Sequence, residues 1–233
     1  MYIGHFGVAF AAKRLAPRTS LATLFAAAEF LDLLWPVLLL TGVEHVRIVP
    51  GITKVSPLDY YHYPISHSLL LVCVWAVLFA AGYWIVCRYW RGAWVMSALV
   101  LSHWVLDAIV HRPDLPLSPG YLPMVGFGLW NHRVASIALE LILFGVGLLI
   151  YLRTTVAFDR IGNGSLLGLV TFLLVTWMAN IFGPHPPSVR AIAIVGVTAI
   201  LFVPWGAWID HHRSRRKRIE SEDRLFTEKH IGI

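Results

Sequence analysis

Six long apolar stretches set the strongest limit on how this chain can fold. Each has about 18 to 23 residues: 20–42, 68–86, 92–110, 134–152, 165–182 and 191–209. Because an α-helix rises about 1.5 Å per residue, about 20 apolar residues cross the hydrocarbon core of a membrane. Only 14% of the chain is charged, whereas soluble domains are about 25% charged. The sequence therefore predicts an all-α, polytopic membrane bundle of about six transmembrane helices, with residues 1–210 as one integral membrane domain.

The first twelve residues form a shorter apolar segment that ends at Lys13 and Arg14. Twelve residues are too few to span a bilayer. We expect a short helix that either re-enters the membrane or lies at its surface. His5 lies within it and is either a site residue or an interfacial histidine.

Lys and Arg are distributed unevenly between the two sets of loops. One side holds Lys13, Arg14, Arg18, Arg88, Arg91, Arg153, Arg160 and the basic tail 211–233. By the positive-inside rule, this side is cytoplasmic, so both termini are predicted to be cytoplasmic. The formal net charge of +6 is then a topology signal and an attraction to membrane lipids, not a nucleic-acid surface.

The third apolar stretch carries His103, Asp107 and His111 at four-residue steps. At 3.6 residues per turn these positions lie close to one face of a helix. Ionisable side chains inside a membrane are costly, so they usually face inward and have a function. The alternative is that they make polar contacts that hold helices together.

Other spans carry further ionisable groups. Glu29 and Asp32 lie one turn apart in the first stretch, and Glu140 lies in the fourth. Counted along each helix from the basic side, Asp32, His103, Asp107 and Glu140 all fall at about 18 to 24 Å. Several further histidines fall near the opposite membrane surface: His62, His67, His111 and His132. This overlap predicts a polar pocket in the outer half of the membrane.

Imidazoles combined with carboxylates favour zinc, manganese or iron as the bound metal. The candidate ligands are His5, Asp32, His62, His67, His103, Asp107 and His111. Glu29 and Glu140 are candidates for the general base, or for orienting the ligands. Arg112, Arg133 and His132 are placed to bind an anionic substrate at the outer mouth. A divalent ion held by this set would lower the pKa of its water and polarise a phosphoryl or acyl oxygen, which is chemistry suited to hydrolysis of a phosphoester or lipid-like substrate.

Four motifs resemble those of the bacterial membrane-bound metal-dependent hydrolases, the YdjM-like family (domain of unknown function 457). They are Gly4-His5-Phe-Gly7, Leu31-Asp32, the run from His62 to Ser68, and Ser102-His103-Trp-Val-Leu-Asp107. The chain departs from the family pattern after Asp32, where a second aspartate is usual. The resemblance implies a metal-dependent hydrolase, with zinc the favoured metal, in the bacterial inner (cytoplasmic) membrane.

Two other classes of function remain open. A transporter would use intramembrane His and Asp residues to relay protons or hold a metal in transit, although no internal repeat of the kind that many transporters show is visible. A structural membrane protein would use the same residues for hydrogen bonds between helices.

Overall fold

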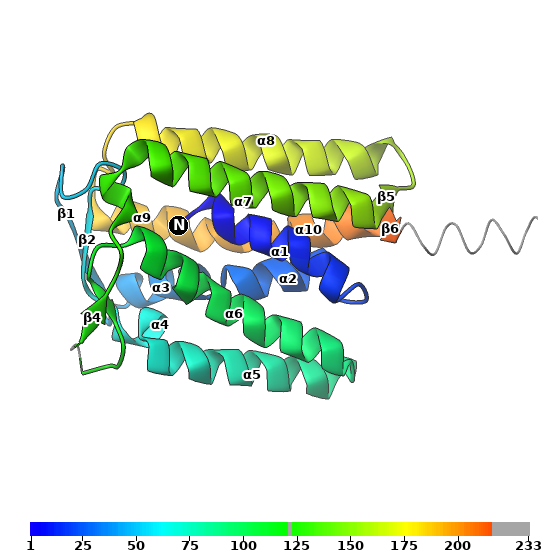
Figure 1. Ribbon diagram of the computed structural model, residues 1–233, viewed down its shortest axis with the longest axis horizontal. Coiled ribbons are helices and arrows are strands. Elements are labelled where there is room, and N and C mark those ends of the chain that lie inside the picture. Colours follow the sequence, from blue (N-terminus) through cyan, green and yellow to red (C-terminus); the bar gives the residue numbers. More distant parts are fainter. Residues whose placement is uncertain (121–122, 216–233) are drawn as a thin grey trace, which may run out of the picture.

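A computed structural model describes residues 1–120 and 123–215 of the chain, which form a mostly helical bundle (Figure 1). The predicted tail 211–233 lies outside the described residues beyond Arg215. Four helices are each long and apolar enough to cross a membrane: α5 (Leu69–Cys87), α6 (Trp90–Val110), α7 (Arg133–Thr154) and α8 (Arg160–Phe182). A fifth span, Val189–His211, comprises α9 (Val189–Thr198), η2 (Ala199–Leu201) and α10 (Phe202–His211). The predicted class, a polytopic helical membrane bundle, is confirmed.

The first predicted span is broken in the structure. It forms α2 (Leu21–Ala28) and α3 (Phe30–Leu40), which meet at an angle of 57° around Glu29. Counted as one span, this pair gives the six that the sequence predicts. Irregular backbone at membrane depth requires partners inside the protein, and the Ala28 carbonyl oxygen accepts a hydrogen bond of 2.6 Å from His103 Nδ1.

The short N-terminal helix, α1 (Ile3–Leu15), lies inside the bundle between α2, α6 and α7 (Figure 1). Ile3, Phe6 and Phe10 are at most 1% exposed, so α1 is a core element. The two predicted arrangements were a helix that re-enters the membrane and one at the membrane surface; the burial of α1 among other helices excludes a position at the bundle surface.

Two glycines bring α1 and α7 into backbone contact. A Cβ atom added to Gly7 would overlap the backbone at Leu143 and Phe144, and one added to Gly147 would overlap the backbone of Gly7. Small residues allow membrane helices to approach this closely. The close approach fixes the position of α1, and with it the position of His5.

The outermost long helix, α5, faces away from the core. Only 11% of its apolar window is buried, compared with 56% for α6. Val77, Ile85 and Val86 are each more than half exposed. An apolar surface of this kind is suited to contact with lipid. The much higher buried fraction of α6 identifies α6 as the central helix of the bundle.

Short strands close the two ends of the bundle (Figure 1). One end, here called the hairpin end, holds the antiparallel pair β1 (His45–Ile48) and β2 (Leu58–His62), the pair β3 (Leu115–Pro116) and β4 (Met124–Val125), the one-turn α4 (Pro64–His67) and η1 (Leu129–Asn131). The opposite end holds the antiparallel pair β5 (Thr155–Ala157) and β6 (Arg213–Arg215).

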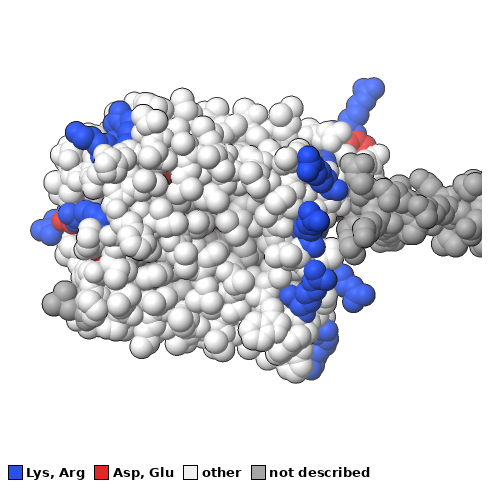
Figure 2. All heavy atoms as spheres, viewed as in Figure 1, with Lys and Arg blue, Asp and Glu red and all other residues white. Residues whose placement is uncertain are grey.

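Positive charge gathers at the end that carries β5 and β6, here called the basic end (Figure 2). Its exposed side chains include Arg14, Arg18, Arg88, Arg91, Arg153 and Arg160. On the face shown, the broad middle band displays no Lys or Arg among the described residues. An uncharged band between charged ends is the surface expected of a protein that crosses a membrane.

Lys13 anchors α1 at the basic end. Its Nζ atom lies 2.7 Å from Asp210 Oδ2 and 2.8 Å from the Thr19 carbonyl oxygen. Asp210 Oδ2 also accepts the Leu21 backbone N–H at 2.5 Å. One carboxylate therefore ties α1, α2 and α10 together.

Replacing Lys13 with methionine is expected to lower the free energy of unfolding by about 3 kcal/mol, because Asp210 would remain as a largely buried, unpaired charge. Arg14→Met is the matched control, since Arg14 is the next residue and is exposed; its effect should stay within about 0.5 kcal/mol. Unfolding in detergent, followed by circular dichroism, measures both. Equal stability of the two variants would show that the ion pair does not hold the bundle.

Candidate metal centre

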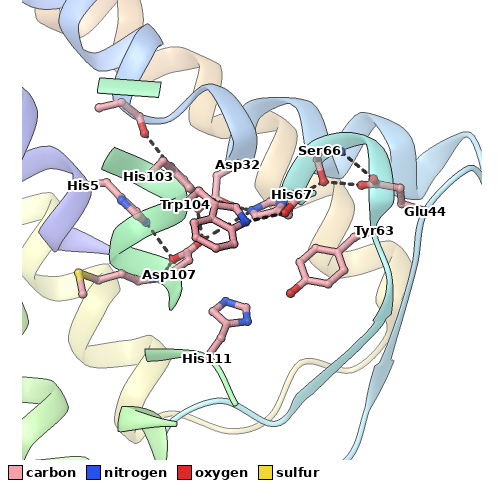
Figure 3. A network of polar contacts seen from close by, with 12 residues as sticks. His5, Asp32, Glu44, Tyr63, Ser66, His67, His103, Trp104, Asp107 and His111 are labelled. Atoms are coloured by element: carbon pink, nitrogen blue, oxygen red, sulfur yellow. Dashed lines mark hydrogen bonds and ion pairs between the residues drawn. The ribbon is translucent and has the colours of Figure 1, made fainter. Parts of the chain in front are cut away.

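Five ionisable side chains converge inside the bundle, toward the hairpin end (Figure 3). They come from α1, α3, α4 and α6, and are here called the central cluster: His5, Asp32, His67, His103 and Asp107. Four of them are at most 4% exposed, whereas the Asp32 side chain is 36% exposed. The cluster is therefore enclosed on most sides and accessible at Asp32.

The donor atoms of four residues in the cluster lie close together. His103 Nε2 lies 3.3 Å from Asp107 Oδ2 and 3.7 Å from Asp32 Oδ1. His67 Nε2 lies 3.6 Å from Asp107 Oδ2 and 3.7 Å from Asp32 Oδ1. His67 Nε2 and His103 Nε2 thus each face both carboxylates.

Hydrogen bonds at the far sides of the rings orient both imidazoles. His103 Nδ1 faces the Ala28 carbonyl oxygen, which can only accept, so Nδ1 carries the proton. His67 Nδ1 lies 2.7 Å from Ser66 Oγ, and the His67 carbonyl oxygen accepts from Trp104 Nε1 at 2.9 Å. In a neutral His103, the Nε2 lone pair therefore faces the carboxylates.

Donor atoms in this cluster lie close enough together to share a metal ion. Two groups of three residues each offer atoms that all lie within 4.8 Å of one another: His5, His103 and Asp107, and Asp32, His67 and His103. His103 belongs to both groups, whereas Asp32 and Asp107 belong to different ones. Among the described residues, His103 Nε2 is buried without a hydrogen-bond partner. The His and Asp groups of the central cluster could therefore hold a metal ion.

Comparison with known proteins adds no assignment. No family model, curated protein or solved structure matches this chain. The interpretation of the cluster rests on its own geometry.

His5 lies on the other side of Asp107. Its ring stacks on His103, with ring centres 3.7 Å apart and planes 3° from parallel. His5 Nε2 lies 3.2 Å from Asp107 Oδ1, which also contacts the Met1 backbone nitrogen. One carboxylate therefore faces His5 through Oδ1 and the other imidazoles through Oδ2.

The two predicted catalytic glutamates are both buried but differ in their contacts. Glu140 Oε2 accepts the backbone N–H groups of Tyr2 at 2.9 Å and Gly4 at 3.3 Å, so it holds the start of α1. Glu29 occupies the bend between α2 and α3, and its Oε1 atom has no hydrogen-bond partner among the described residues. Of the two, Glu29 has the oxygen available for a proton.

His62 and His111, which the sequence also placed among the ligands, lie outside the central cluster. His62 is in β2, opposite His45, with ring centres 5.3 Å apart. His111 Nδ1 lies 3.0 Å from Asp114 Oδ1, and its ring packs against Trp130. Neither belongs to the two groups of donor atoms that could hold an ion.

The predicted substrate-binding residues lie at the hairpin end. Arg112 is paired with Asp59 and, at 3.0 Å, with Asp114, so its charge is compensated within the protein. Arg133 is exposed and donates to the Lys54 carbonyl oxygen. His132 is also exposed. Arg133 and His132 are thus the more accessible of the three.

Two tyrosines of the hairpin end pack against histidines of the site region. Tyr63 packs against His67, with ring centres 5.0 Å apart, and Tyr60 packs against His111 at 4.8 Å. Burial, reinforced by nearby carboxylates, raises the pKa of both phenols well above the ordinary value. Both therefore stay protonated at neutral pH.

Neither Glu44 nor Ser66 was predicted from the sequence as a site residue. Ser66 Oγ contacts His67 Nδ1, and Glu44 accepts the Ser66 hydroxyl (Figure 3). Ser66 could have been noted as the neighbour of a candidate ligand. Nothing in the sequence links Glu44 to His67, because Glu44 lies near the start of the loop and contacts Ser66 only once the hairpin has folded.

Proposed function

We propose that this chain is a membrane-embedded, metal-dependent hydrolase that acts on a phosphoester or lipid-like substrate. The observation that carries the proposal is that His67 Nε2 and His103 Nε2 face two carboxylates at 3.3 to 3.7 Å. Such an arrangement needs a cation between the acceptor atoms, or protons on the imidazoles.

A cation fits the charge of the cluster. Asp32 and Asp107 supply two negative charges, and the Met1 amino group, which pairs with Asp107, supplies one positive charge. A negative charge therefore remains for a bound ion to balance while the imidazoles stay uncharged. Neutrality matters here because an uncompensated charge inside a membrane is costly. Imidazole and carboxylate ligands favour zinc, with manganese and iron as alternatives.

The accessible side of the cluster is where a substrate could approach. His67, His103 and Asp107 are buried and would hold the ion, whereas Asp32 is 36% exposed. A bound ion would supply a water of lowered pKa and would polarise a phosphoryl or acyl oxygen. Glu29 is the candidate to accept a proton, and Arg133 and His132 are the candidates to attract an anionic group.

The proposed setting is the bacterial inner membrane, with the basic end cytoplasmic; the Met1 nitrogen, predicted to be cytoplasmic, lies instead beside Asp107 in the central cluster. The basic end supports this orientation, because exposed arginines concentrate on the cytoplasmic side of membrane proteins. The central cluster would then lie in the outer half of the bilayer, in contact with membrane lipids. The resemblance of four motifs to those of the membrane-bound metal-dependent hydrolases favours the same proposal.

A second candidate function is the transport of a metal ion or of protons. The broken span α2–α3 supports it, since transporters often bind their substrates where a membrane helix is interrupted. Asp32 lies in the first turn after this break. This alternative uses the same residues but predicts movement across the membrane.

The first experiment is elemental analysis of the purified protein in detergent, beside hydrolysis and flux assays. Hydrolysis is measured with bis(p-nitrophenyl) phosphate and with phospholipid vesicles, and flux with proteoliposomes that contain a zinc-sensitive dye. A hydrolase should bind about one ion per chain and form product without flux, and Asp32→Asn should remove the activity. Flux without product would favour the transporter. Folded protein that binds neither zinc nor manganese would overturn the metal-dependent hydrolase.

A further inference from the structure

Glu44 is a buried carboxylate with three hydrogen-bond donors. It is 1% exposed. Its Oε1 atom accepts the backbone N–H groups of Ile65 at 2.7 Å and Ser66 at 2.8 Å. Its Oε2 atom accepts the Ser66 hydroxyl at 2.6 Å. Three donors fix the position of this carboxylate against the start of α4.

The Ser66 hydroxyl lies between Glu44 and His67 (Figure 3). A hydroxyl has a single hydrogen, and Ser66 donates it to Glu44. Its oxygen can therefore only accept from His67 Nδ1, 2.7 Å away. His67 Nδ1–H therefore donates to Ser66 Oγ, and the Ser66 hydroxyl donates to Glu44.

We propose that Glu44 and Ser66 are positioning residues that hold His67 in its Nδ1–H tautomer and aim its Nε2 lone pair into the central cluster. The Ala28 carbonyl does the same for His103 from the opposite side. Partners of this kind fix the ring orientation and the basicity of a ligating histidine. The consequence for metal binding rests on the proposed function, but the tautomer does not.

The tautomer can be measured in metal-free protein. Long-range ¹H–¹⁵N correlation spectra of ¹⁵N-histidine-labelled protein in detergent distinguish the protonated ring nitrogen, and His67→Gln assigns the signals. We expect His67 to be protonated at Nδ1 in the wild type. In Ser66→Ala, Nδ1 loses its acceptor, so the signals should shift toward the other tautomer. Ser66→Thr retains a hydroxyl and should restore the wild-type pattern.

Ser68→Ala is the matched control. Ser68 flanks His67 on its other side and is 0% exposed, and its hydroxyl has no hydrogen-bond partner among the described residues. Its removal should leave the His67 tautomer unchanged. A general effect of losing a buried serine would change the His67 signals in both variants. Loss of a positioning residue should change them only in Ser66→Ala.

Zinc affinity provides the second readout. Loss of a group that orients a ligand typically weakens metal binding by about 10- to 100-fold, and we expect this for Ser66→Ala but not for Ser68→Ala. Retention of the wild-type His67 signals in Ser66→Ala would overturn the inference, as would a wild-type His67 that carries a proton at Nε2 and none at Nδ1. If the wild type binds no zinc, the proposed function fails, and the tautomer measurement alone decides this inference.

Discussion

Replacing Asp107 with asparagine is expected to weaken zinc binding by more than about 100-fold, beyond the range for residues that only orient a ligand. Asparagine has nearly the same shape but carries no charge. The Asp107 carboxylate faces His67 and His103 through Oδ2 and His5 through Oδ1. Removing its charge leaves Asp32 as the single negative group among the donors of the central cluster.

Asp114→Asn is the control for this variant. Asp114 is also buried and lies near the same end of the bundle, but its carboxylate pairs with His111 and Arg112. It should lose stability without losing metal. Elemental analysis and zinc titration compare the two, with gel filtration to establish that each is folded. A folded Asp107→Asn variant that retains the wild-type affinity would remove Asp107 from the ligand set.

The second large effect is expected at Gly147. Alanine at this position should lower the free energy of unfolding by about 3 kcal/mol, the upper part of the range for overpacked cores. The added Cβ would overlap the Gly7 backbone. Since a backbone cannot change rotamer to make room, α1 and α7 would have to separate.

The opposite result is expected at Gly145, which lies two residues away on the same helix. A Cβ added there meets nothing within 4 Å. Alanine at this position should be neutral, or stabilising by up to about 1 kcal/mol, because glycine is a poor residue for a helix interior. Thermal unfolding in detergent distinguishes the two. Equal behaviour of the variants would show that the α1–α7 contact is not tightly packed.

The spans were predictable from the sequence because hydropathy and length report directly on the lipid environment. The bend at Glu29 was not, since glutamate does not break helices and Pro36 lies more than a turn later. What favours the bend is a long-range contact, the hydrogen bond between His103 and the Ala28 carbonyl oxygen. Helical periodicity contains no information on such a partner.

For the candidate site, depth along each helix was the useful signal. It brought Asp32, His103 and Asp107 to a common level, but it placed His67 nearer the opposite membrane surface and put Glu140, which is not part of the central cluster, at that same level. It could not separate His67 from His62, which lie close in sequence at the same membrane surface. The structure separates them because β2 ends at His62 and α4 begins at Pro64, which turns His67 inward. Counting charges likewise could not reveal that Asp59 and Asp114 compensate Arg112.

The bend between α2 and α3 also makes the central cluster sensitive to events far from its donor atoms. A straight α2–α3 span would use the Ala28 carbonyl for its own helical ladder, in competition with His103 Nδ1. His103 could then protonate at either nitrogen, and Asp32 would rotate with the first turn of α3. If the central cluster holds the proposed ion, its occupancy and the curvature of this span are therefore thermodynamically linked: whatever straightens the helix should expel the ion, and a bound ion should hold the helix bent.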